Sequence, residues 1–314
     1  MKSNRNAVFA AAPWLAAVVL VIHGPGQCAR AQDTNFNFQA TNPAAAQKRG
    51  ADADYELGRR YAIGLGVPQD YIKAVKYLRQ SADQGYAPAQ TGLGSCYAHG
   101  LGVKQDYAAA VEWYRRAAAQ GDPLAQYGMG YAYAYGKGVA TNFDQAVQWW
   151  QKSAEHGQVY AQSALGRLYF QGEGPGDTNH INYAASAKWL RLAAEQGYVP
   201  AMNTLGFLYQ SGLGVGQEWT EAVRWYRCAA EQGDANAQAN LGLMYEDGHG
   251  GLPHDKVQAY KWLLLSAAQG NAEGRHDVFE FKSHQSITPE QTAEAERLAA
   301  EFRARTNHPA ENRN

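Results

Sequence analysis

The sequence predicts an all-α solenoid, because one pattern of about 36 residues is repeated six times along the chain. Aligned on its alanines and glycines, the unit reads A-x-x-x-L-G-x-x-Y-x-x-G-x-G-V-x-x-D-x-x-x-A-x-x-W-x-x-x-A-A-x-x-G. A fixed period between about 20 and 50 residues indicates stacked repeats, each of which packs only on its neighbours. The six units begin at Ala53, Ala89, Ala125, Ala161, Ala201 and Ala237.

The composition of the 314-residue chain fits a well-packed helical array. Aromatic residues make up 12% of the chain and charged residues 18%, a balance that argues against intrinsic disorder. The formal net charge is −1, so the chain lacks the basic footprint of a nucleic-acid-binding protein.

The first 31 residues have the features of an export signal. Lys2 and Arg5 precede an apolar run over residues 7–22, and Ala29-Arg30-Ala31 supplies an A-x-A cleavage site. We therefore expect cleavage before Gln32, a periplasmic or secreted mature protein, and no stable membrane insertion. The alternative is an uncleaved signal that tethers the protein to the membrane.

Each unit is expected to contain two helices. The first runs from the leading alanine past Leu-Gly to the tyrosine, as over Ala89–His99, and ends at a G-x-G pair, where glycine tolerates the left-handed conformation of a helix end. The second begins at an Asp or Asn whose side chain can cap the free N–H groups. The expected caps are Asp70, Asp106, Asn142, Asn182 and Asp255, with Glu218 as the exception.

The second helix carries a small residue followed three positions later by an aromatic one, as at Ala110 and Trp113. This spacing keeps both on one helical face, so we expect the aromatic residues to fill the core between helix pairs. Unit four departs from the pattern with four additional residues within 174–180, in the turn between its helices.

After Gly274 the pattern fades, but Thr288-Pro289-Glu290-Gln291 is a capping-box helix start. Leu298, Ala299 and Phe302 then form an apolar stripe, which predicts a final helix pair that closes the solenoid. The predicted organisation is a signal peptide at 1–31, a flexible linker at 32–52, six repeats at 53–274, and capping helices with a polar tail at 275–314.

Two cysteines, Cys96 and Cys228, remain after the predicted cleavage. They fall in the second and fifth units, which the stacking of repeats holds apart. A disulfide requires Cα atoms within about 7 Å of one another. We therefore expect both thiols to be free and buried.

With the unit laid out, the chain resembles the Sel-one-like repeat (SLR) family, which is related to the tetratricopeptide repeats. The resemblance rests on the leading motif, as over Ala89–Asp106, and on A-x-x-W-x-x-x-A-A, as over Ala110–Ala118. It implies a right-handed α-α superhelix that serves as a protein-interaction scaffold and has no catalytic residue. A cysteine-rich branch of similar repeats is linked to β-lactam binding, but this chain lacks the paired cysteines of that branch.

Positions that differ between units are the candidates for binding. By analogy with tetratricopeptide grooves, first-helix positions 3, 7, 10 and 11 of each unit line the concave surface. In units three to five the candidate groove residues are Tyr127, Tyr131, Tyr135, Arg167, Phe170 and Phe207, beside Ser163 and Asn203. Aromatic residues and arginine dominate binding hot spots, so we expect a groove for a peptide or helix of a partner protein. The competing interpretation is that these rings pack against the neighbouring helix.

No motif indicates catalysis or a cofactor. The G-x-G pairs lie between helices and none continues into G-K-[ST], which argues against a phosphate-binding loop. The loop over residues 246–255 contains possible metal ligands but also reads as a polar turn that ends at a helix cap. We expect a non-enzymatic adaptor with no cofactor and no bound metal. The alternative is a protein that binds or hydrolyses peptidoglycan or a β-lactam.

Overall fold

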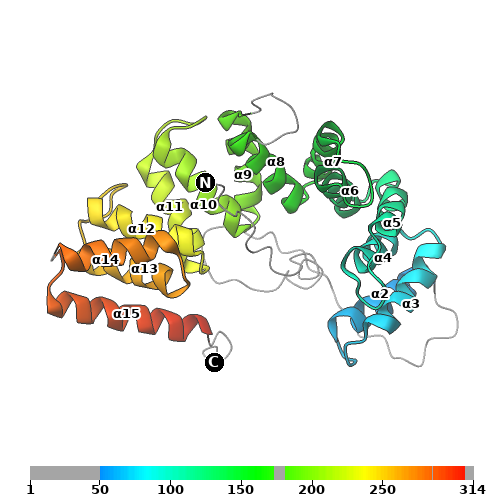
Figure 1. Ribbon diagram of the computed structural model, residues 1–314, viewed down its shortest axis with the longest axis horizontal. Helices are drawn as coiled ribbons and strands as arrows, with labels where there is room; N and C mark the ends of the chain where they lie inside the picture. Colours follow the sequence, from blue (N-terminus) through cyan, green and yellow to red (C-terminus); the bar gives the residue numbers. More distant parts are fainter. Residues whose placement is uncertain (1–49, 173–180, 285, 308–314) are drawn as a thin grey trace, which may run out of the picture.

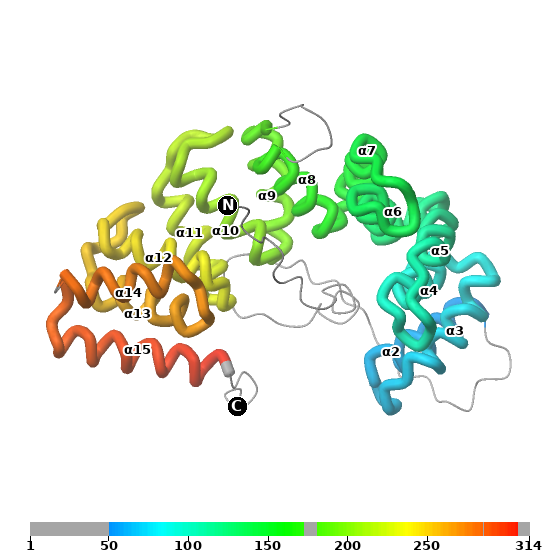
Figure 2. The backbone as a smooth tube through the Cα atoms, in the orientation of Figure 1, coloured from blue at the N-terminus to red at the C-terminus, as the bar shows by residue number. Residues whose placement is uncertain are grey.

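The computed structural model describes residues 50–172, 181–284 and 286–307, and over these ranges it contains helices but no strand. The helices follow an arch from α2 at one end to α15 at the other (Figure 1), and the backbone trace in Figure 2 shows the same curvature. The predicted all-α solenoid is confirmed. The predicted signal peptide at 1–31 and the insertion at 174–180 lie outside the described residues. None of the described helices is long and apolar enough to cross a membrane.

Six consecutive helix pairs form the repeats, and two further helices follow them. The helices are α2 (Ala51–Ile63), α3 (Tyr71–Asp83), α4 (Ala87–His99), α5 (Tyr107–Ala119), α6 (Pro123–Tyr135), α7 (Phe143–Glu155), α8 (Val159–Gln171), α9 (Tyr183–Glu195), α10 (Val199–Ser211), α11 (Trp219–Glu231), α12 (Ala235–Asp247), α13 (Lys256–Ala268), α14 (Ala272–Ser283) and α15 (Pro289–Asn307).

The ends of the helices follow the predicted signals. First helices end at a left-handed glycine, as at Gly100 with a φ of 70°. Glu218 has the extended backbone of a cap, yet its side chain makes no capping bond, because the longer side chain does not fold back as Asp or Asn does. The five predicted caps each accept a hydrogen bond from an N–H of the first turn: Asp70, Asp106, Asn142, Asn182 and Asp255.

The glycine of the Leu-Gly motif allows the two helices of a repeat to approach closely. A Cβ atom at Gly94 would lie 2.9 Å from the Tyr114 ring, and one at Gly206 would lie 2.8 Å from the Tyr226 ring. Real Cβ atoms do not come this close to other heavy atoms, so a larger residue would push the helices apart. The corresponding side chains in the other units are Leu78, Trp150, Leu190 and Leu263.

The large side chain that packs against this glycine therefore follows the predicted aromatic position by one residue, as Tyr114 follows Trp113. Trp225 and Trp262 are buried as expected, at 2% and 5% exposure. In units two to four the tryptophan is half-buried. A cation lies over its ring there, as Arg116 does at 4.6 Å from the centroid of Trp113. The prediction that every such ring fills the core was wrong for these units, because the ring there lies at the edge of the core beside a cation, whereas Trp262 is covered by Phe302 of the last helix.

The second glycine of each G-x-G pair sets the contact between repeats. A Cβ atom at Gly102 would overlap the backbone oxygen of Tyr71, which lies at the start of α3 in the preceding unit. Gly138 faces Tyr107 in the same way. Gly66 belongs to the first unit, and no atom lies within 4 Å of its Cβ position. The turn of one repeat therefore rests directly on the second helix of the previous repeat.

Buried glutamines link neighbouring repeats by hydrogen bonds. The Gln90 side chain is 5% exposed and donates to the carbonyl of Ala82 at the end of the preceding repeat, at 3.2 Å. Gln120, at the end of the second helix of the same repeat, donates to the Gln90 side-chain oxygen at 2.9 Å. Gln162 and Gln238 make the corresponding pairs of bonds, so the amides are satisfied where they are buried.

The last two helices close the core as predicted. The Thr288 N–H donates to the Gln291 side chain at 3.1 Å, and the Gln291 N–H donates to the Thr288 hydroxyl at 3.2 Å, which completes the capping box. Helix α15 packs on α13, where the ring centroids of Trp262 and Phe302 lie 5.2 Å apart. Its outer face is charged, with Arg297 paired to acidic residues on its own helix.

The cysteine prediction is correct for one residue. Cys96 is a free, buried thiol. Cys228 is also buried but is disulfide-bonded, so the prediction of a free thiol there was wrong. The repeat spacing excludes only a bond between Cys96 and Cys228, which lie in different repeats.

Replacing Glu218 with Asp should stabilise the protein by about 1 kcal/mol, because the shorter carboxylate can cap α11 as Asp106 caps α5. Urea denaturation followed by circular dichroism measures the change. Asp106→Ala is the matched control and should destabilise by about the same amount. An unchanged midpoint for Glu218→Asp would contradict this view of the helix start.

Gly66 and Gly102 allow the contact between repeats to be tested directly, since their φ angles are 71° and 69°. Gly66→Ala should cost about 1–2 kcal/mol from the left-handed backbone alone. Gly102→Ala should cost a further 1–3 kcal/mol or so, because the added methyl group collides with α3. Thermal and urea unfolding of both variants measure the difference, and equal losses would show that the turn does not support the stack.

Candidate functional site

The predicted groove residues lie on the first helices of the third, fourth and fifth repeats, α6, α8 and α10. Successive first helices contact one another: the rings of Tyr127 in α6 and Tyr160 in α8 lie 5.8 Å apart. The rings of Phe170 in α8 and Phe207 in α10 lie 5.9 Å apart. We use the term concave surface for the surface formed by the side chains of α4, α6, α8 and α10, the side of the stack that the sequence predicts to hold the groove.

Four of the six predicted groove residues present accessible side chains on this surface. Tyr131 and Tyr135 are 43% and 45% exposed, with ring centroids 4.6 Å apart. Phe207 is 40% exposed. The exposed Arg167 guanidinium of α8 donates a hydrogen bond to the Tyr135 hydroxyl of α6 at 2.9 Å. The structure thus brings three of these side chains, Tyr131, Tyr135 and Arg167, together at the junction of units three and four.

The other two predicted groove residues pack between helices. Tyr127 is partly buried against Tyr160, and this burial raises the pKa of its hydroxyl, to which the nearby Tyr198 also contributes. Phe170 is half-buried, with its ring 5.9 Å from both Phe207 and Tyr183. These two rings support the walls of the surface, so the packing interpretation fits them.

The concave surface is almost free of charge. Across α4, α6, α8 and α10, the one residue of the Asp, Glu, Lys and Arg types is Arg167. By contrast, α3, α5, α9, α11 and α13 each carry at least two basic residues. None of the ion pairs found among the described residues includes Arg167. Its charge is therefore available to an anionic or carbonyl group of a ligand.

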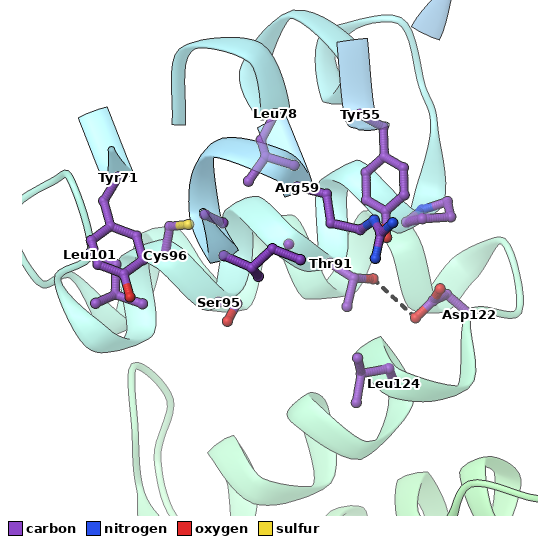
Figure 3. Close-up of a pocket in the computed structure, with 14 residues that line it drawn as sticks. Tyr55, Arg59, Tyr71, Leu78, Thr91, Ser95, Cys96, Leu101, Asp122 and Leu124 are labelled. Carbon is purple, nitrogen blue, oxygen red and sulfur yellow. Dashed lines mark hydrogen bonds between the residues drawn. The ribbon is translucent and has the colours of Figure 1, made fainter. Parts of the chain in front are cut away.

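A cavity of about 150 Å³ lies at the first-repeat end of this surface (Figure 3). Tyr55 and Arg59 of α2 face Thr91 of α4 across it, and Leu78 of α3 lines its apolar part. The Thr91 hydroxyl donates to the Asp122 carboxylate at 2.9 Å. The cavity therefore has an apolar interior, and its charged side chains, Arg59 and Asp122, already have partners.

The sequence reasoning did not identify this cavity. Tyr55 and Thr91 occupy the same position of the unit as Tyr127, and Arg59 and Ser95 the same position as Tyr131. The candidate groove residues come from units three to five, and the same repeat positions in units one and two are Tyr55, Arg59, Thr91 and Ser95. The cavity itself depends on packing between helices, which the register alone does not show.

The loop over 246–255 makes a hydrogen bond within its own repeat and a ring contact with the preceding repeat. His254 contacts the backbone oxygen of Glu246 through Nδ1 at 2.7 Å, and the His249 ring stacks on Trp219 with centroids 4.0 Å apart. Within the part of the chain that the structure describes, no three His, Cys, Asp or Glu side chains converge as a metal site would require.

The stacked helix pairs define an α-solenoid repeat protein. The Sel1 repeat profile matches residues 51–86, 87–122, 123–158, 159–198, 199–234 and 235–271. The chain belongs to the Sel1 repeat family, whose members generally act as protein-interaction scaffolds and are typically not enzymes.

The solved structures that are similar to the chain include two Sel1-type repeat proteins. A protective antigen present in uropathogenic Escherichia coli strains, which has an SLR fold, is 37% identical with a TM-score of 0.68. The match covers 80% of this chain and 53% of that one, so this chain spans about half the length of that relative. A Sel1 repeat protein from Oxalobacter formigenes is 33% identical with a TM-score of 0.65, over 76% of this chain and 67% of that one. No curated protein matches the chain significantly in sequence.

Cys96 lines the cavity and provides a reporter of its accessibility. The thiol is 4% exposed, and burial raises its pKa to about 12. At pH 8 its thiolate fraction is therefore about a thousandfold below that of an exposed cysteine. Alkylation read at the Cys96 peptide by mass spectrometry should be slower by about that factor than in denaturant. Rapid alkylation of the native protein would show that the cavity opens readily.

Proposed function

We propose that this protein is an exported, non-enzymatic adaptor whose concave surface binds a largely uncharged segment of a partner protein. The observation that carries the proposal is the composition of that surface: exposed rings surround a single charged residue, Arg167. The N-terminal signal sequence supports export, and membership of the Sel1 repeat family supports a scaffolding role.

The exposed rings provide the apolar part of the interaction. Tyr131, Tyr135 and Phe207 are rigid side chains that already hold defined positions on the surface, so they lose little conformational entropy when a ligand covers them. Tyrosine and arginine are also the residue types that most often dominate the binding energy of protein interfaces. A segment with alternating apolar side chains would pack along these rings.

Arg167 provides the directional contact. Its guanidinium is held toward Tyr135 by the hydrogen bond to the hydroxyl, which leaves other N–H groups free to donate. A carboxylate or a backbone carbonyl of the partner would accept these bonds, and a carboxylate would gain the strength of a charge-assisted pair. Because the surrounding surface is uncharged, this contact would fix the position of the partner along the groove.

Affinity capture from an envelope extract tests the proposal. The wild-type protein is compared with the variant Tyr131→Ala, Tyr135→Ala, Arg167→Ala, after equal helicity has been established by circular dichroism. The matched control replaces three exposed second-helix residues, Arg115, Gln148 and Lys188, with alanine. We expect wild type and control to retain a partner protein that the groove variant loses by at least tenfold.

Equal retention by the groove variant would contradict the proposed site. Retention of muropeptides or of a β-lactam in place of a protein would contradict the adaptor function and favour a cell-wall protein.

The salt dependence of partner binding gives a second prediction. Because the surface carries one charged residue, Arg167, salt can screen few charge–charge contacts between this surface and the partner. The dissociation constant measured by calorimetry should change by less than about threefold between 50 and 500 mM NaCl. A loss of affinity of more than about tenfold would indicate that the partner binds the basic second helices instead.

A further inference from the structure

The cavity between the first and second repeats has no role in the repeat packing described above. It lies between α2 and α4, beyond the rings of units three to five, on the same concave surface. Its volume of about 150 Å³ is smaller than the few hundred Å³ typical of small-molecule sites. A site of this size suits a single side chain rather than a whole ligand.

The cavity exists because α4 presents small residues where the next repeat presents large ones. Thr91 and Ser95 stand at the positions that Tyr127 and Tyr131 occupy in α6. Gly92 between them has no side chain, and a Cβ atom there would lie 3.4 Å from Leu78, at ordinary contact distance. The space is therefore not required for the approach of the helices.

The lining of the cavity disfavours a charged guest. The Arg59 guanidinium makes two hydrogen bonds to the Glu56 carboxylate, at 2.9 and 3.1 Å. The Asp122 carboxylate accepts bonds from the Thr91 hydroxyl and the Ala125 N–H. A guest charge would lose its hydration without gaining a free partner of opposite sign, whereas an apolar group would gain contact with the aliphatic walls.

We propose that this cavity anchors one aromatic side chain of the partner segment, an inference that rests on the function proposed above. A dry cavity of about 150 Å³ is large enough to hold a benzene ring. Aromatic side chains that fill pockets are also typical anchors of protein interfaces. The occupant is therefore a largely uncharged peptide segment with a phenyl ring in the cavity and a carboxylate at Arg167.

Ligand-observed NMR titration of the purified full chain tests the anchor, with N-acetylphenylalanine amide as the probe and N-acetylalanine amide as the ringless control. The variant Gly92→Leu fills the cavity, and Thr204→Leu places the same side chain at the same position of unit five. We expect the phenyl probe to bind wild type and Thr204→Leu, and its affinity to fall at least tenfold in Gly92→Leu. If Gly92→Leu melts at the same temperature as wild type, or at a higher one, its fold is kept.

Equal binding of the probe to Gly92→Leu, or no preference for the phenyl probe over the alanine probe, would overturn the proposal. The predicted linker of this chain contains two phenylalanines, Phe36 and Phe38. Probe binding that appears only after both are replaced with alanine would also overturn the proposal, because the occupant would then be this chain rather than a partner. The adaptor function is tested separately by the groove variant, whose altered residues lie outside the cavity lining. A partner that Gly92→Leu retains in full, but the groove variant loses, would contradict the anchor alone.

Discussion

Two contacts that only glycine permits determine the geometry of this protein. Within a repeat, the glycine of the Leu-Gly motif receives a large side chain of the second helix, as Gly94 receives Tyr114. Between repeats, the second glycine of the G-x-G turn rests on the backbone of the preceding second helix, as Gly102 does on Tyr71. Interiors are packed too densely to absorb an added methyl group freely at either place. Because these two contacts recur along the chain, successive repeats pack on one another with similar geometry, and the stack curves into an arch.

The concave surface is a consequence of this stacking. Positions that hold the helices together carry the same small or apolar residues in each unit, whereas the inward-facing positions are free to differ. They hold tyrosines in unit three, arginine and phenylalanine in unit four, and small residues in unit two. The scaffold thus presents exposed rings and Arg167 on α6, α8 and α10, next to a cavity that Arg59 and Tyr55 of α2 help to line. These are the features expected of a surface that recognises a peptide by its side chains.

The sequence predicted the parts of the structure that depend on local chemistry. The period gave the helix pairs, short polar side chains gave the helix starts, and Thr288 with Gln291 gave the final cap. The features that it missed depend on partners distant along the chain. The glutamine ladder is one example, since Gln90 is identifiable as a bridge only when Ala82 and Gln120 are seen around it.

In the candidate site too, the sequence predicted the features that depend on local helix geometry and missed those that depend on contacts between repeats. The helical register placed Tyr131 and Tyr135 on one exposed stripe, because spacing by four residues is a local property of a helix. It could not separate them from Tyr127, whose partial burial depends on Tyr160 of the next repeat. The cavity was missed for a related reason. It forms where α4 has small side chains at Thr91 and Ser95 and none at Gly92, and no residue type by itself indicates such a space.

Hydrogen–deuterium exchange of the protein alone and with its captured partner tests the central claim, that the concave surface is the binding surface, most directly. Bound peptide should slow exchange in α4, α6, α8 and α10 and leave the outward faces of α5, α7, α9 and α11 unchanged. Protection confined to the second helices would contradict the account, because it would place the partner on the opposite side of the solenoid.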